Sequence, residues 1–72
     1  MSAQGPVTLR WRGERPLPEE EGFASLDAAL DAVVARWAVL RDQAPQILDA
    51  RRVLVASTAE LEAIAEEEAA GR

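Results

Sequence analysis

Gln46–Glu60, with the sequence QILDARRVLVASTAE, is the stretch that decides the fold. It contains two short apolar runs, Gln46–Asp49 and Arg52–Ala56, with a break of two residues between them. Val53 and Val55 are β-branched, which favours strands, and a short polar break between two such runs is typical of a hairpin. We therefore predict two strands joined by a turn in this stretch.

A continuous helix is the alternative for the same residues. Ile47, Leu54 and Leu61 lie seven residues apart, as the residues of one helical face do. The break also lacks the glycine that tight hairpin turns prefer. The hairpin remains the favoured interpretation, because Val53–Val55 followed by a serine and a threonine is poor helix material. The alternative would make the chain an all-α helical hairpin, with one helix on each side of Pro45.

The segment that follows is predicted to be a helix. Ser57 and Glu60 stand three residues apart and match a capping box, in which each side chain satisfies a free backbone N–H at the start of a helix. Leu61 and Ile64 follow at the spacing of an inward-facing helical stripe. Gly71 suits the end of this helix.

A longer helix is predicted from about Ser25 to about Asp42. Ser25 is a favourable N-cap residue, and Asp27 lies in the first turn, where negative charge favours the helix dipole. Pro45 disfavours the helical conformation for the residue before it and should stop the helix. Apolar residues recur at spacings of four and three and so share one face: Leu26, Leu30, Val33, Trp37 and Leu40.

The N-terminal part is predicted to hold one strand. Val7–Arg12 alternates apolar and polar residues, which turns Val7, Leu9 and Trp11 toward the core. Arg15–Gly22 is expected to be an extended loop, because its two prolines forbid a continuous helix or a central strand.

These elements predict a single small α+β domain over residues 1–72, with residues 1–6 as a flexible N-terminus. The predicted order is β-α-β-β-α, with a three-stranded antiparallel sheet covered on one face by two helices. The second strand is expected to run parallel to the first after the helical crossover. The third strand is then expected to lie between them.

The composition excludes several kinds of chemistry. Among its 72 residues the chain has no Cys, His, Lys or Tyr. Thiolate and disulfide chemistry, Schiff bases and the commonest general base are therefore ruled out. No His or Lys is present to activate a hydroxyl. We predict that the protein is not an enzyme and has no cofactor or metal site. The hydroxyl-bearing residues are Ser2, Thr8, Ser25, Ser57 and Thr58.

Five arginines are the candidate partner-binding residues. Guanidinium groups bind phosphates and carboxylates through two parallel hydrogen bonds, so clustered arginines suit an acidic partner. The favoured interpretation is nevertheless that they pair with nearby glutamates, such as the Glu19–Glu21 run, or are solvated. Trp11 lies on the opposite strand face and cannot stack a base beside them. The candidates are Arg10, Arg12, Arg15, Arg51 and Arg52.

The leading expectation is a small non-enzymatic, cytoplasmic protein that acts by binding another protein or as a homodimer. The alternatives are nucleic-acid or nucleotide binding through the arginine-bearing strands, and an acidic inhibitor-type mimic. A net charge of −5 disfavours nucleic acid. No apolar run is long enough to span a membrane, and no secretory signal is recognised. Arginine without lysine, together with fifteen alanines, is associated with GC-rich coding and suggests a bacterial or phage source.

Overall fold

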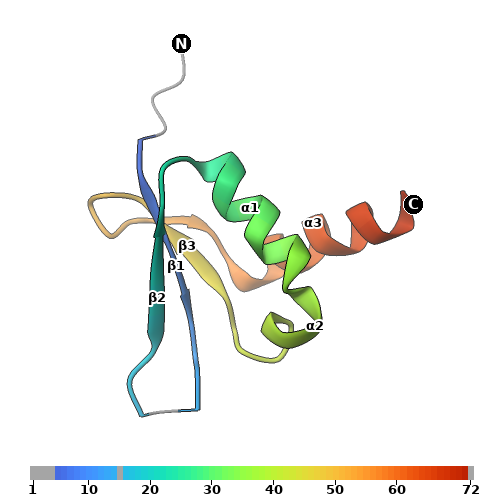
Figure 1. Ribbon diagram of the computed structural model, residues 1–72, viewed down its shortest axis with the longest axis horizontal. Helices are drawn as coiled ribbons and strands as arrows, with labels where there is room; N and C mark the ends of the chain where they lie inside the picture. Colours follow the sequence, from blue (N-terminus) through green and yellow to red (C-terminus); the bar gives the residue numbers. More distant parts are fainter. Residues whose placement is uncertain (1–4, 15, 72) are drawn as a thin grey trace.

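Four strands form an antiparallel sheet, and three helices lie on one of its faces, in the computed structural model, which describes residues 5–14 and 16–71 (Figure 1). The predicted α+β class is therefore confirmed, and the all-α alternative is wrong. The predicted flexible N-terminus lies outside the described residues except for Gly5 and Pro6, which are exposed. The elements are β1 (Val7–Trp11), β2 (Glu19–Phe23), α1 (Leu26–Ala35), α2 (Trp37–Leu40), β3 (Gln46–Leu48), β4 (Leu54–Ala56) and α3 (Thr58–Ala70).

Strand β1 lies inside the sheet, between β2 and β3, in the order β2-β1-β3-β4. Its alternation is as predicted: Val7 and Leu9 are buried under the helices, and Trp11 packs against the same core. Residues with the opposite parity, such as Thr8 and Arg10, therefore lie on the face that carries no helix. We call this face the open face of the sheet.

Strand β2 corrects the prediction of a loop over Arg15–Gly22. Glu19–Phe23 pairs along its whole length with β1, and Val7 faces Phe23 in the register. The two prolines precede this strand and do not enter it. An edge strand tolerates three consecutive glutamates because one side of its backbone has no neighbouring strand, and charge on an edge discourages further pairing. The sheet accordingly has four strands and not three.

The strand order also differs from the prediction. Both β2 and β3 are antiparallel to β1, so they run parallel to each other with β1 between them. The crossover through α1 and α2 therefore starts from β2, which the sequence analysis missed, and not from β1. As a result β3 pairs directly with β1, and β4 takes the outer position, whereas the prediction placed this third strand between the other two.

The long helix predicted over Ser25–Asp42 is divided in two. Ser25 caps α1 as predicted, with its hydroxyl accepting a hydrogen bond from the Ala28 N–H at 3.2 Å. Arg36 leaves the helical conformation, with φ −109° and ψ 17°, and separates α1 from α2. The chain has already left α2 at Arg41, before Pro45 is reached.

The β3–β4 hairpin is confirmed, and its turn is built without glycine. The Asp49 carboxylate accepts hydrogen bonds from the N–H groups of Arg51 at 2.8 Å and Val53 at 2.9 Å. Arg52 adopts φ 67°, the left-handed conformation that glycine usually supplies. An aspartate side chain and one left-handed residue therefore replace the glycine turn.

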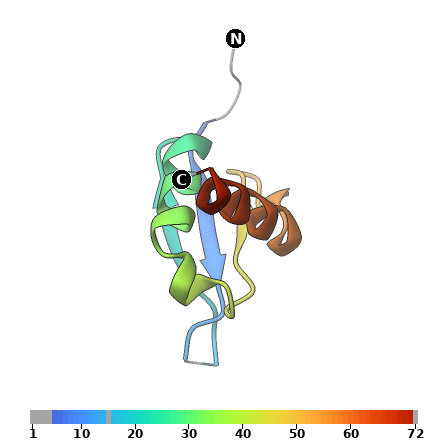
Figure 2. The same cartoon turned by 90° about the vertical axis from the view of Figure 1, so that its right-hand side faces the viewer.

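Helix α3 begins with the predicted capping box of Ser57 and Glu60, in which both hydrogen bonds are formed. Its start is joined to the sheet by the Thr58 hydroxyl, which donates to the Pro45 carbonyl at 2.9 Å. Figure 2 shows α3 beside α1 in front of the sheet. The core lies between these two helices and the sheet, and its buried residues are Val7, Leu9, Ala29, Val33, Leu40, Ile47, Ala56 and Leu61.

Candidate interaction surfaces

The four described arginines among the five predicted as partner-binding residues do not form one continuous patch. Arg10 lies on the open face of β1. Arg12 follows the same strand and is exposed. Arg51 and Arg52 are exposed in the β3–β4 turn, at the far side of the sheet from β2. Arg15 lies outside the described residues.

A glutamate stands among these arginines on the open face. Glu20 is opposite Arg10 in the strand register and forms a two-point ion pair with Arg52, at 2.7 Å and 3.1 Å. Hydrogen bonds from the Arg52 guanidinium, aided by the positive charges of Arg52 and Arg10, lower the pKa of Glu20. The same pair raises the pKa of Arg52. This part of the arginine cluster is therefore neutralised from within, as the favoured interpretation of the sequence held.

A small hollow lies beside Arg10 and Arg12 at the end of β1. Its volume is about 300 Å³. Within the described part of the chain, neither guanidinium forms an ion pair. Glu20 nevertheless lies close enough to Arg10 for its pKa to respond to that charge. Among the described residues, the positive charge at this hollow is therefore that of two arginines beside a carboxylate. The other lining residues are Trp11, Pro16, Pro18, Ala44 and Gln46.

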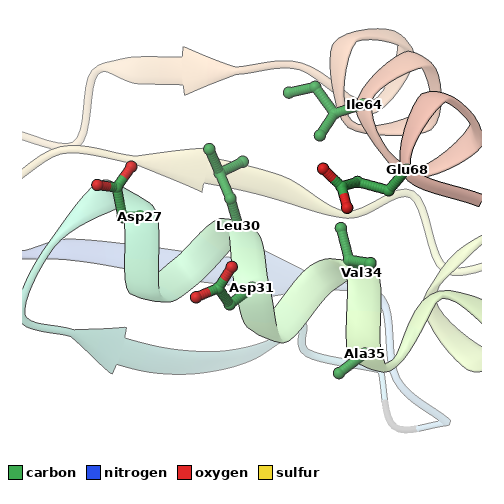
Figure 3. Close-up of a pocket in the computed structure, with 7 residues that line it drawn as sticks. All are labelled: Asp27, Leu30, Asp31, Val34, Ala35, Ile64 and Glu68. Atoms are coloured by element: carbon green, nitrogen blue, oxygen red, sulfur yellow. The ribbon is translucent and has the colours of Figure 1, made fainter. Parts of the chain in front are cut away.

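A larger depression lies between α1 and α3, and we call it the α1–α3 groove. Its volume is about 840 Å³. Figure 3 shows Leu30 and Val34 pointing from α1 toward α3, and Ile64 pointing back from α3. These three side chains are each half-buried, so the floor of the groove offers apolar surface to solvent.

The rim of the α1–α3 groove is acidic. Asp27 and Asp31 stand one turn apart on α1, and Glu68 extends from α3 (Figure 3). All three residues are exposed, and no basic residue lines the groove within the part of the chain that the structure describes. Among the described residues, Asp27 and Asp31 have no ion-pair or hydrogen-bond partner for their carboxylates. The groove therefore combines apolar side chains from both helices with the carboxylates of Asp27 and Asp31 on the α1 side.

This arrangement of carboxylates is not that of a metal site. Across residues 5–14 and 16–71, no three acidic side chains come together in a way that could hold a metal ion. Asp27 and Asp31 repel each other at a spacing of four residues, which costs about 0.2–0.5 kcal/mol in an isolated helix. A positively charged group seated between them would remove that repulsion.

The hydroxyls within the described residues serve mainly the fold. Ser25 and Ser57 cap the starts of α1 and α3, and Thr58 is bonded to the Pro45 carbonyl. Thr8 lies on the open face of β1, paired in the register with Gly22 and Leu48. None of these described hydroxyls donates a hydrogen bond to a carboxylate that could activate it.

Sequence reasoning missed the groove because its residues resemble ordinary core and helix-dipole residues. Leu30 was assigned to the core stripe of the helix, and Asp27 to its first turn. The signal in the sequence is a shared spacing: Asp27 and Asp31 are four residues apart, and so are Leu30 and Val34. On a helix, this spacing places the carboxylates along one side of an apolar strip. Only the packing of α3 shows that this strip stays partly uncovered.

Comparison with protein-family models, with curated proteins and with solved structures finds no match to this chain. None of the helices within residues 5–14 and 16–71 has the length and apolar character needed to cross a bilayer.

Proposed function

We propose that this chain is a non-enzymatic protein-interaction module that contacts its partner through the α1–α3 groove. The carrying observation is the groove itself, in which half-buried Leu30, Val34 and Ile64 form an apolar floor between exposed carboxylates. An apolar strip with a charged rim is the usual make-up of a protein contact surface, whose centre is apolar and whose edge is polar.

The alternative of nucleic-acid binding through the arginine-bearing strands has less support. Phosphate binding needs several unpaired cations along one surface. Arg52 is paired with Glu20, and Arg10 lies beside the same carboxylate. The acidic rim of the groove would repel phosphates on the helical side of the molecule. A contact through the α1–α3 groove agrees better with the other alternative, an acidic inhibitor-type mimic, because that role also requires carboxylates at the interface.

The non-enzymatic part of the proposal rests on the groups that the chain carries. Its sequence contains no His, Cys, Lys or Tyr. The carboxylates of the groove are exposed, and catalytic carboxylates are commonly tuned by burial and by close charged neighbours. The groove therefore suits binding better than acid–base chemistry.

Affinity purification with a matched pair of variants tests the proposal. Ala35 lines the groove, whereas Ala38 on α2 does not, and both alanines are exposed. Ala35→Arg adds bulk and positive charge to the groove, and Ala38→Arg makes the same change outside it. The tagged wild-type chain and the Ala38→Arg variant should recover one stoichiometric partner that Ala35→Arg loses. Equal recovery by both variants would contradict the proposed site.

A further inference from the structure

The charge of the α1–α3 groove restricts the chemistry of what it can hold. Among residues 5–14 and 16–71, it is lined by Asp27, Asp31 and Glu68 and by no basic residue. Two of these carboxylates, Asp27 and Asp31, have no ion-pair partner in the described part of the chain. A ligand that excludes water from the apolar floor must bring positive charge to the rim, because desolvated carboxylates without partners are costly.

The shape of the floor restricts the form of the occupant. Leu30 and Val34 are one turn apart on α1, and Ile64 faces them from α3 (Figure 3). An apolar strip between two helices is the surface on which an amphipathic helix lays its apolar face, with anchors at spacings of three, four and seven residues. Helix α1 has 10 residues, so it offers roughly 15 Å of length, which is enough for nearly three turns of a bound helix.

A second copy of this chain does not meet these requirements. The sequence of α1 is LDAALDAVVA and that of α3 is TAELEAIAEEEAA, and neither contains a basic residue. Placing either helix in the groove of another copy would bring carboxylates against carboxylates, which is unfavourable. Helix α2 is flanked by Arg36 and Arg41, but with 4 residues it is too short to fill the groove. The groove therefore fits a helix of a different protein.

We infer that the α1–α3 groove binds a basic amphipathic helix of a partner protein, with apolar residues on the floor and Lys or Arg side chains against Asp27 and Asp31. This inference rests on the proposed docking role of the groove and adds the chemical class of the partner. The attraction between exposed charges falls with ionic strength, so the binding should weaken as salt is added. The apolar floor should keep part of the affinity at high salt.

A synthetic probe tests this inference without knowledge of the natural partner. The probe is a helical peptide of about 14 residues, roughly 21 Å long, with leucines at helical spacing on one face and lysines beside them. Its control has glutamate in place of every lysine. In two-dimensional amide NMR of the full chain, the lysine peptide should shift signals of Leu30, Val34 and Ile64, and the glutamate peptide should not.

Paired charge variants locate the contact on the protein. Asp27→Asn/Asp31→Asn removes two negative charges from the rim, and Glu66→Gln/Glu67→Gln removes two from the part of α3 that does not line the groove. Two exposed ion pairs correspond to a loss of about three- to ten-fold in affinity for the first variant. The second variant should lose less than about two-fold.

Two results would overturn the inference. One is the absence of shifts at the groove residues with millimolar lysine peptide, and the other is an equal loss of affinity in both double variants. The proposed function fails on a different result, namely retention of the natural partner by Ala35→Arg. If Ala35→Arg releases the partner while the lysine peptide does not bind, the docking role stands and the basic helix is excluded.

Discussion

Arg52 in the β3–β4 turn reaches Glu20 on β2, and its Nη2 lies 2.7 Å from the Glu20 Oε2. The two residues stand on opposite sides of β1 and β3 in the sheet order. Their ion pair therefore spans the open face of the sheet and ties the hairpin to the far edge. It also explains why the basic surface expected from the sequence is divided, since the carboxylate occupies its middle.

The ion pairs predict a specific loss of stability in acid. Arg52 lowers the pKa of Glu20, and Arg36 lowers the pKa of Glu21 through a hydrogen bond of 2.7 Å. A carboxylate with a lowered folded pKa contributes stability above its unfolded pKa, which is lost as the pH falls through the folded pKa. The thermal midpoint of the wild type should therefore fall more between pH 6 and about pH 3 than that of Glu20→Gln/Glu21→Gln.

The control for this prediction is Glu66→Gln/Glu67→Gln, which removes equal charge from exposed positions of α3 that form no described ion pair. Its acid profile should follow that of the wild type. If the Glu20→Gln/Glu21→Gln profile also follows the wild type, the two ion pairs do not form in solution.

The β3–β4 turn should depend on the side chain of Asp49. Asp49→Ala removes the acceptor for the N–H groups of Arg51 and Val53 and should cost about 1–2 kcal/mol in the free energy of unfolding. Asp49→Asn keeps an acceptor oxygen and should retain most of that stability. Asp42→Ala, at an exposed position without a described hydrogen bond, should change the value by less than about 0.5 kcal/mol. Urea denaturation of the three variants measures the difference, and equal values for Asp49→Ala and Asp42→Ala would contradict it.

Replacement of alanine by glycine should stabilise the protein at Ala44 and destabilise it at Ala63. Ala44 has φ 51°, a left-handed conformation that costs a residue with a Cβ more than it costs glycine. Ala44→Gly should therefore stabilise the protein by about 0.5–1 kcal/mol. Ala63 lies exposed within α3, where glycine costs about 1 kcal/mol. The two variants should move the thermal midpoint in opposite directions, and a loss of stability in Ala44→Gly would exclude the left-handed conformation.

The attachment of α3 to the sheet should depend on Leu61. Its side chain is fully buried, with 0% exposed, and Leu61→Ala should cost about 2–4 kcal/mol through lost burial and a cavity. Leu17 is 77% exposed, so Leu17→Ala should stay within about 0.5 kcal/mol of the wild type. Denaturant curves measure both changes. A loss below about 1 kcal/mol for Leu61→Ala would show that α3 is not packed on the core in solution.

The parts of the fold that follow local rules could be predicted from the sequence. The Ser25 and Ser57 caps, the inward residues of β1 and the β3–β4 hairpin all depend on neighbouring residues. Strand β2 could not be predicted, because its glutamates are typical of a loop and its pairing with β1 supplies the stabilisation. Once β2 is missed, the crossover starts from the wrong strand and the sheet order is wrong.

The break between α1 and α2 at Arg36 could not be predicted from the neighbouring residues either. No glycine or proline marks it, and its carbonyl accepts hydrogen bonds from Val39 and Leu40 in a new turn. The partner of its side chain is Glu21, on the strand that was not predicted.

The candidate site is predictable only in part for the same reason. The sequence shows that the two aspartates lie beside Leu30 and Val34 on the surface of α1, but it does not show where α3 packs. Ile64 on α3 has the spacing of a core residue. Its side chain remains half-buried because the contact between α3 and α1 leaves part of it exposed. The ion pairing of the arginines was partly predictable, since pairing with the Glu19–Glu21 run was part of the favoured interpretation.

A photo-reactive amino acid placed at Val34 tests the central claim most directly. The same residue at Val39, which is 67% exposed and does not line the α1–α3 groove, is the matched control. After irradiation in the cells that produce the protein, position 34 should cross-link to one partner, and the attached peptide should carry Lys or Arg beside apolar residues at helical spacing. Cross-linking of that partner from position 39 and not from position 34 would contradict the account.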